Sequence, residues 1–237
     1  MEFDTLQNIL QGAIADSRQR DAHSLSDRSY KLALSDAFFC GEDTVRNKKF
    51  YEAIGKAIAD IQIKFPSDRI RVIDAGSGTW ILWLCALIQG ADYVSFIEAN
   101  PHTLAWSKKF IEKFWYAQKC EFYSEDAMNI ILSEQHHLLI SETITIDFQR
   151  EDFHYIVSHL KQFLYSGAPI IPQAFELELS QKNSKDIIIY SEIIQRRSLD
   201  WIGSHVQHLH PKTQVLEISW TATLYDDIEI QSWESMS

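Results

Sequence analysis

Polar motifs follow two β-branched segments of this 237-residue chain and carry the side chains most able to do chemistry. The first segment, 70–74, ends at Asp74, and the second, 93–97, is followed directly by Glu98. The turn after the first segment consists of Gly76, Ser77 and Gly78. A glycine turn after a strand directs the next helix's N-terminus at a bound group, and an acid at the tip of the second strand can accept hydrogen bonds from both hydroxyls of a ribose. The pattern predicts a nucleoside-binding half-site.

The glycine turn separates two classes of nucleoside cofactor. A dinucleotide site uses Gly-x-Gly-x-x-Gly to seat a pyrophosphate on the helix N-terminus. Here Trp80 and Ile81 follow Gly78, and there is no third glycine. S-adenosylmethionine carries an ammonium and a sulfonium, and the carboxylate of Asp74 suits these cations better than a pyrophosphate. We therefore expect S-adenosylmethionine as the cofactor.

In this region the sequence resembles class I S-adenosylmethionine-dependent methyltransferases. Residues 74–79, Asp-Ala-Gly-Ser-Gly-Thr, look like the loop that binds the methionine half of the cofactor in those enzymes. The resemblance implies that Glu98 binds the ribose. It also implies that Asp126, which follows a third expected strand at 120–124, contacts the adenine.

A narrower resemblance, to protein arginine methyltransferases, rests on residues after the fourth expected strand, 137–140. There Ser141-Glu142 is followed nine residues later by Glu151, as in the double-glutamate hairpin of that family. Two carboxylates suit a guanidinium because it is planar, always charged and able to form paired hydrogen bonds. The resemblance implies that Glu142 and Glu151 are the catalytic pair that orients the acceptor, in a direct transfer that needs no metal.

Two further segments extend the resemblance to roughly residues 30–180. Residues 43–54 resemble the helix start in which an arginine of the family pairs with the donor's carboxylate, and Arg46 takes that place. Residues 167–172 resemble the join between the family's Rossmann-like domain and its β-barrel.

The sequence departs from the family pattern at three places. Trp80 stands where a glycine is usual, and its indole could close over the cofactor, crowd it out or turn into the interface between sheet and helix. The hairpin 143–148 lacks the usual Met-Gly, and its Asp147 could substitute for either glutamate. No segment matches the family's Thr-His-Trp loop well. Two alternatives stay open: transfer to another nitrogen or oxygen acceptor, and a catalytically inactive binding subunit.

Strand and helix signals alternate between residues 70 and 164. This order predicts an α/β fold, a Rossmann-like and mostly parallel sheet with helices on both faces. Beyond it, 174–179 and 214–220 alternate apolar and polar residues, as half-buried antiparallel strands do. Before it, helices are expected at 3–15 and 48–63, with a polar segment at 16–29.

These elements predict three parts of the chain. An N-terminal helical segment takes residues 1–65, and a Rossmann-like cofactor-binding domain takes 66–168. A reduced, β-rich C-terminal domain takes 169–237. The 46% hydrophobic content is enough to fill one α/β domain with a small appendage.

Composition and short motifs narrow the function classes. A net charge of −11 argues against broad nucleic-acid binding. The chain has no apolar run of the roughly 18 residues that span a membrane, and its first residues do not read as a signal peptide. The expected partner is an arginine-containing protein, peptide or small molecule, and the expected assembly is a homodimer.

Cysteine and histidine usage adds two expectations. Cys40, Cys85 and Cys120 are far apart and odd in number, which predicts reduced thiols in a cytoplasmic protein. The spacing of His205, His208 and His210 fits no common zinc pattern, so no metal site is expected.

Overall fold

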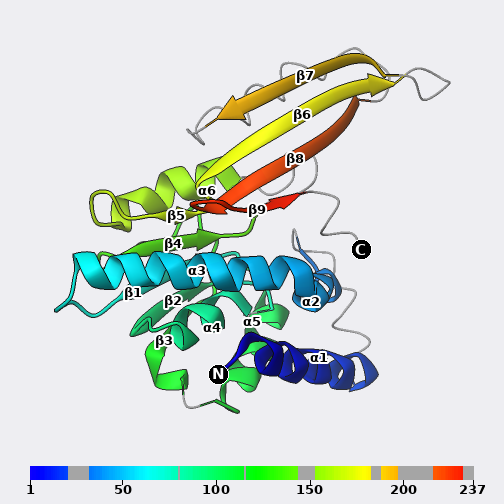
Figure 1. The fold of residues 1–237 in the computed structure, drawn as a ribbon. Helices are drawn as coiled ribbons and strands as arrows, with labels where there is room; N and C mark the ends of the chain where they lie inside the picture. Colours follow the sequence, from blue (N-terminus) through cyan, green and yellow to red (C-terminus); the bar gives the residue numbers. More distant parts are fainter. Residues whose placement is uncertain are drawn as a thin grey trace.

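In the computed structural model, the structure is described for seven parts of the chain: residues 1–20, 32–79, 81–114, 116–143, 153–182, 188–196 and 216–231. Three helices come first in the chain. They are α1 (Phe3–Arg20), α2 (Leu34–Glu42) and α3 (Thr44–Lys64). In the view of Figure 1, α3 crosses in front of the strands of a central sheet, and α1 lies below it.

The central sheet is parallel throughout and has the strand order β3-β2-β1-β4-β5. Its strands are β1 (Arg71–Ala75), β2 (Tyr93–Ile97), β3 (Cys120–Tyr123), β4 (Leu138–Ser141) and β5 (Ile170–Ile171). The helices between them are α4 (Ile81–Ile88), α5 (Pro101–Ile111), α6 (Phe153–Leu160) and the 3-10 turns η2 (Ala117–Lys119) and η3 (Lys161–Phe163). The sheet and its helices confirm the predicted α/β, Rossmann-like class.

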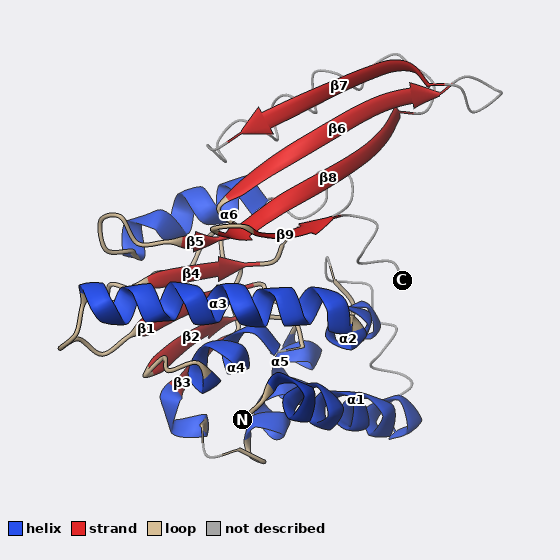
Figure 2. Cartoon of the chain, viewed as in Figure 1, coloured by secondary structure: helices blue, strands red, loops and turns tan. Residues whose placement is uncertain are grey.

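A second sheet of four antiparallel strands follows, in the order β7-β6-β8-β9. It is formed by β6 (Ala174–Lys182), β7 (Ile188–Arg196), β8 (Leu216–Tyr225) and β9 (Ile228–Gln231). Figure 2 shows the long strands of this sheet extending away from the parallel one. The alternating segments at 174–179 and 214–220 thus lie largely in β6 and β8, as their pattern predicts.

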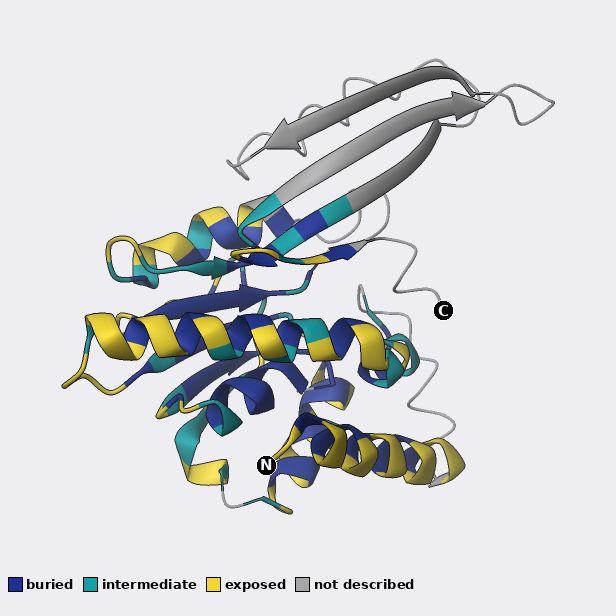
Figure 3. Cartoon of the chain, viewed as in Figure 1, coloured by how far each residue is buried: buried dark blue, intermediate teal, exposed yellow. Residues whose placement is uncertain are grey.

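Local sequence explains the elements that border the site. All eight residues of α4 are apolar, and seven of them are buried, so this helix forms inside the core and not on its surface. Helix α5 begins where Asn100 accepts hydrogen bonds from the next backbone N–H groups and Pro101 takes the first helical position. Figure 3 shows the resulting pattern: dark, buried central strands and an α3 that is exposed along one stripe.

The N-terminal helices differ from the sequence prediction. Residues 16–20 continue α1 instead of starting a polar loop, and α2 lies in a segment where no helix was expected. The reason for the longer α1 is a tertiary contact. Ser17 is buried, donates to the carbonyl of Ala13 and accepts the indole N–H of Trp106 at 2.7 Å. A polar residue that finds such partners no longer favours a loop.

Helix α3 packs against both parts of the fold. Its buried residues join the core of the parallel sheet, and the same core includes Ala222 and Leu224 of β8. Tyr225 donates a hydrogen bond to Asp60 of α3 at 2.9 Å, and Lys56 pairs with Asp227 at 2.7 Å. The division at residues 65 and 168 stays a prediction, and β5 lies just beyond the second of these positions.

None of the helices in the described part of the chain combines the length and the apolar content needed to cross a lipid bilayer.

His136, a buried histidine just before β4, should make the stability of the fold decrease in acid. Burial, together with the charge of Arg71, lowers the pKa of His136 from 6.5 to about 4. The unfolded chain therefore binds a proton below pH 6.5 that the folded chain does not bind until about pH 4. Between these values the free energy of unfolding should fall by about 1.4 kcal/mol per pH unit as the pH decreases.

Urea unfolding between pH 7.5 and pH 4.5 measures this slope, with His136→Asn as the comparison. The variant should lose the contribution of this one group. Equal slopes in both proteins would contradict the assignment.

Candidate functional site

The candidate site lies at the carboxyl edge of the parallel sheet. Ala75 of β1 pairs in register with Ile97 of β2 and with Ser141 of β4, so the loops after these three strands begin side by side. Ligands of open α/β sheets bind at this edge. Gly76, Ser77, Gly78, Glu98 and Glu142 follow these strand ends, whereas Arg46 comes from α3.

The glycine turn after β1 has the backbone that its sequence predicts. Gly76 and Gly78 have φ values of +66° and +53°, a region that other residues rarely adopt. The N–H groups of Gly76 and Ser77 both donate to the carbonyl of Ile97, at 3.0 and 3.1 Å. The Ser77 hydroxyl donates to the carbonyl of Asp74 at 2.7 Å. The turn is therefore tied down on β1 and β2.

The side chain of Asp74 is directed at the first turn of α4. Its side chain is 1% exposed, and its carboxylate accepts the backbone N–H of Trp83 in the first turn of α4 at 3.1 Å. Burial raises the pKa of Asp74 to about 8, even though that N–H and Ser77 act in the opposite direction. In this structure Asp74 holds the start of α4 against the strand.

Glu98 closes over the glycine turn from β2. Its carboxylate accepts the N–H of Gly78 at 2.9 Å and the N–H of Asn100 at 2.7 Å. Burial raises the pKa of Glu98, and these N–H groups oppose the shift. Both carboxylate oxygens are thus engaged with backbone, one of them on the turn itself.

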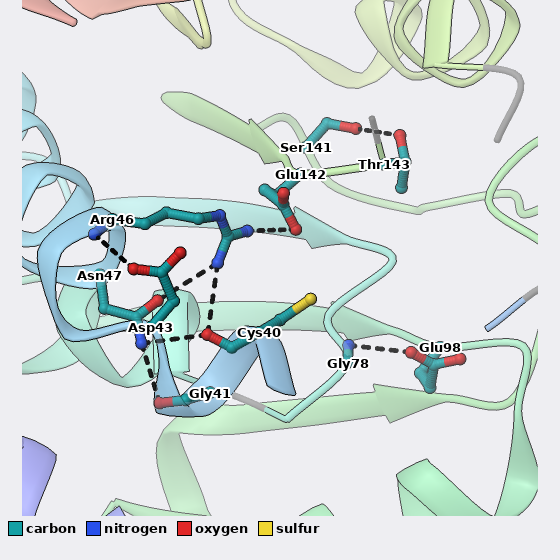
Figure 4. A network of polar contacts seen from close by, with 10 residues as sticks. All are labelled: Cys40, Gly41, Asp43, Arg46, Asn47, Gly78, Glu98, Ser141, Glu142 and Thr143. Atoms are coloured by element: carbon teal, nitrogen blue, oxygen red, sulfur yellow. Dashed lines mark hydrogen bonds and ion pairs between the residues drawn. The ribbon is translucent and has the colours of Figure 1, made fainter. Parts of the chain in front are cut away.

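Arg46 and Glu142 form an ion pair across the site (Figure 4). The guanidinium is buried, while 20% of the Glu142 side chain stays exposed. A second guanidinium nitrogen donates to the carbonyl of Cys40 at 3.5 Å and to Oδ1 of Asn47 at 3.3 Å. Phe50 places its ring 5.2 Å from the guanidinium carbon, within cation–π range. Both terminal nitrogens of the Arg46 guanidinium therefore have partners.

The charge of Arg46 survives this burial. Desolvation lowers the pKa of the guanidinium, but Glu142, Cys40 and Asp43 together raise it above its ordinary value. Asp43 begins α3 and accepts the backbone N–H of Arg46 at 3.0 Å through Oδ1. Its Oδ2 is buried and has no hydrogen-bond partner among the described residues.

Thr143 ties the acceptor side of the site to the cofactor side. Its methyl group occupies the place where a Cβ on Gly76 would lie, and its hydroxyl is 3.1 Å from that of Ser141. Gly76 is thus required twice, by its backbone angle and by the approach of Thr143. Sequence reasoning singled out neither Thr143 nor Asn47, and only the polar type of Asn47 on an apolar helix face could have drawn attention to it.

Several predicted residues lie apart or cannot be placed. Asp126 follows β3 and accepts the N–H of Met128 at 2.9 Å in a tight turn. Other sequence expectations lie outside the described residues, namely those for Trp80, Asp147, Glu151, His205, His208 and His210. Within the described part of the chain, no group of three or more histidines, cysteines and acids is placed to hold a metal ion.

A surface groove of about 750 Å³ lies elsewhere, between α3 and the turn that joins β8 to β9. Lys56 and Asp227 are among its lining residues, and neither Arg46 nor Glu142 is. We place the site at the sheet edge because the glycine turn and the buried ion pair meet there.

No protein-family model matches the chain. Curated relatives are named protein arginine N-methyltransferase 7. The protein from Drosophila grimshawi is 25% identical over 189 residues, which are 78% of this chain and 26% of that protein. The one from Drosophila melanogaster is 26% identical over 207 residues, which are 84% of this chain and 29% of that protein. The chain therefore spans less than a third of these relatives' length.

Among solved structures that share the fold is the Trypanosoma brucei PRMT1 enzyme-prozyme heterotetrameric complex with AdoHcy, with a TM-score of 0.52 and 16% identity. The match covers 61% of this chain and 44% of that one. In sequence and in fold, the chain is similar to protein arginine methyltransferases.

Replacing Gly76 with alanine tests how tightly the glycine turn and the strand end after β4 are packed. Gly76→Ala should lower the free energy of unfolding by about 2 kcal/mol or more, through the positive φ and the clash with the Thr143 methyl group. Thr143→Ser removes that methyl group and keeps the hydroxyl. The double variant should therefore regain the stability lost to the clash and keep only the cost of the positive φ, about 1–2 kcal/mol. Urea unfolding of the four proteins measures both parts, and additive effects would refute the contact.

Proposed function

We propose that the chain is an S-adenosylmethionine-dependent N-methyltransferase that acts on an arginine guanidinium of a protein, a peptide or free arginine. The observation that carries the proposal is the ion pair between Arg46 and Glu142. Glu142 already receives a guanidinium at the sheet edge, beside a glycine turn suited to a nucleoside. The similarity to arginine methyltransferases in sequence supports the same acceptor.

The residues at the edge fit the cofactor. The two glycines give the turn a backbone free of side chains, and Glu98 lies at the tip of β2, where a ribose diol would find an acceptor. Arg46 offers a fixed cation for the carboxylate of the methionine half. The unpartnered Oδ2 of Asp43 is an acceptor available to a donor group. When bound, the cofactor supplies an electrophilic methyl group on its sulfonium.

Arg46 links donor binding to acceptor binding. In the structure it pairs with Glu142. A carboxylate placed beside Arg46 would compete for the same guanidinium and leave Glu142 without its cation. A partly buried carboxylate that loses its partner is costly, so it favours a replacement cation. The guanidinium of the substrate is such a cation.

Glu142 would then orient the acceptor. Its carboxylate would accept hydrogen bonds from the substrate guanidinium and hold one nitrogen in line with the methyl group. The energy of binding would thus be used to align the reacting atoms. Burial also raises the pKa of Glu142, although Arg46 opposes the shift, so the carboxylate holds a proton more readily. It is therefore placed to take the proton that the methylated nitrogen loses. Glu151 is the second carboxylate by resemblance.

The assembly and the location are also proposals. The Trypanosoma protein named above forms a heterotetrameric complex, which supports an oligomer for this chain, with a homodimer as the simplest form. Cys40, Cys85 and Cys120 are reduced and are not joined to one another by a disulfide, which supports a reducing compartment such as the cytoplasm.

The Glu142→Gln variant tests the proposed acceptor role. Methyl transfer to arginine peptides should fall by about a hundredfold, because a neutral amide cannot hold the guanidinium in line. Affinity for S-adenosylhomocysteine should be no weaker than in the wild type, since Arg46 is released from Glu142. Calorimetric titration and a methyl-transfer assay measure the two effects.

Glu134→Gln is the matched control, because Glu134 lies before β4, away from the site, and pairs loosely with Arg71 at 3.8 Å. It should leave both readouts unchanged. Donor binding with transfer only to other acceptors would favour a different N- or O-methyltransferase. No donor binding by the wild type would favour an inactive binding subunit. Undiminished transfer by Glu142→Gln would refute the role given to this residue.

A further inference from the structure

A line of buried polar side chains runs from the first helix to the candidate site. Gln7 of α1 is 3% exposed, Asn47 of α3 is 0% exposed and Arg46 is 5% exposed. Apolar residues are the usual occupants of such positions, since a buried polar group is costly unless its hydrogen bonds are made. The three residues therefore need an explanation in the contacts they make.

Asn47 stands at the centre of these contacts. Its amide nitrogen donates to the carbonyls of Gly41 and Cys40, at 2.9 and 3.2 Å, and approaches Oε1 of Gln7 at 3.4 Å. The amide of Gln7 donates to the Gly41 carbonyl at 2.8 Å. These carbonyls lie in the last turn of α2, where the Cys40 carbonyl also accepts the N–H of Asp43 at 3.4 Å. The two amides therefore add a cap from outside the helix.

The other end of the Asn47 side chain faces the site. Its Oδ1 accepts one of the guanidinium N–H groups of Arg46 at 3.3 Å, and the Cys40 carbonyl accepts from the same nitrogen. The other terminal nitrogen, Nη2, carries the ion pair with Glu142. One planar group is thus fixed by two acceptors on one side, which sets the direction of the other side.

The end of α2 also touches the glycine turn. A Cβ on Gly41 would lie 2.9 Å from the hydroxyl of Thr79, directly after Gly78. The end of α2, whose carbonyls Asn47 and Gln7 hold, therefore packs against the residue that follows the cofactor turn.

We infer that Asn47, supported by Gln7, is a positioning residue that fixes the Arg46 guanidinium for the carboxylate of the methyl donor. The inference rests on the proposed function, because it assigns Arg46 to that carboxylate. It makes α1, which is far from the sheet edge in sequence, part of the donor site.

Two probes separate positioning from general support of the fold. S-adenosylhomocysteine carries the carboxylate, whereas 5′-methylthioadenosine has the same adenosine and sulfur without it. Asn47→Leu should weaken S-adenosylhomocysteine by about tenfold, as expected when a hydrogen bond to a charged group is lost, and change 5′-methylthioadenosine by less than about twofold. Gln7→Leu should act in the same direction and less strongly. Calorimetric titration gives these affinities without any assay of activity.

A double variant closes the argument. In an Arg46→Met background, Asn47→Leu should cause no further loss of S-adenosylhomocysteine affinity, since its effect is transmitted by the guanidinium. Lys48→Met, at an exposed neighbouring position of α3, is the matched control and should alter neither probe. Thermal unfolding of each variant reports on its fold. Gln7→Leu leaves Asn47 in place, so it decides the question if Asn47→Leu does not fold.

The outcomes are distinct. Equal weakening of both probes by the variants, or no change in either, overturns the positioning role while leaving the proposed function in place. Wild-type protein that binds neither probe refutes the proposed function itself. Selective loss of the probe that carries the carboxylate supports the inference.

Discussion

The ion pair between Arg46 and Glu142 is the interaction on which the geometry of the site depends. It joins the first turn of α3 to the residue after β4. Burial makes each charge expensive without the other, so the pair fixes how α3 begins over the sheet edge. The Asp43 cap, the Phe50 ring and the Asn47 amide all gather around the guanidinium. Their arrangement follows from keeping one buried cation satisfied.

Two carboxylates of the site are paired within the protein. Glu98 accepts from the backbone of the glycine turn, and Glu142 accepts from Arg46. A ligand that binds here exchanges protein contacts for new ones, so its net gain comes from the difference between the two sets. Such a site is shaped by its internal partners, and a ligand must match them to displace them.

Helix α3 connects this chemistry to the rest of the molecule. One turn presents Arg46 and Asn47 to the site, and later turns bury apolar residues in the core that β8 shares. Tyr225 and Asp60 fix the C-terminal sheet to the same helix. One helix thus contacts both the sheet edge and the antiparallel extension.

Local features of the sequence predicted the strand, glycine turn and helix from Arg71 to Ile88, and Glu98 at the next strand end. The alternation of apolar and polar residues, the apolar runs and the need for a positive φ each involve residues close together in the chain. They can therefore be recognised in a single sequence. The polar composition of residues 16–20 predicted a loop, whereas the structure has a helix there. The helix is supported by Trp106, whose indole contacts Ser17 only in the folded protein.

The sequence by itself determined the α/β class, the glycine turn and the types of the candidate residues. The tertiary structure alone decided which of them meet. Asp74 accepts a hydrogen bond from α4, Glu142 pairs with Arg46, and Gln7 contacts Asn47. These contacts form because folding brings distant segments of the chain together. Which side chains pair depends on distances that are set only when the core packs, so no local sequence pattern predicts the pairs.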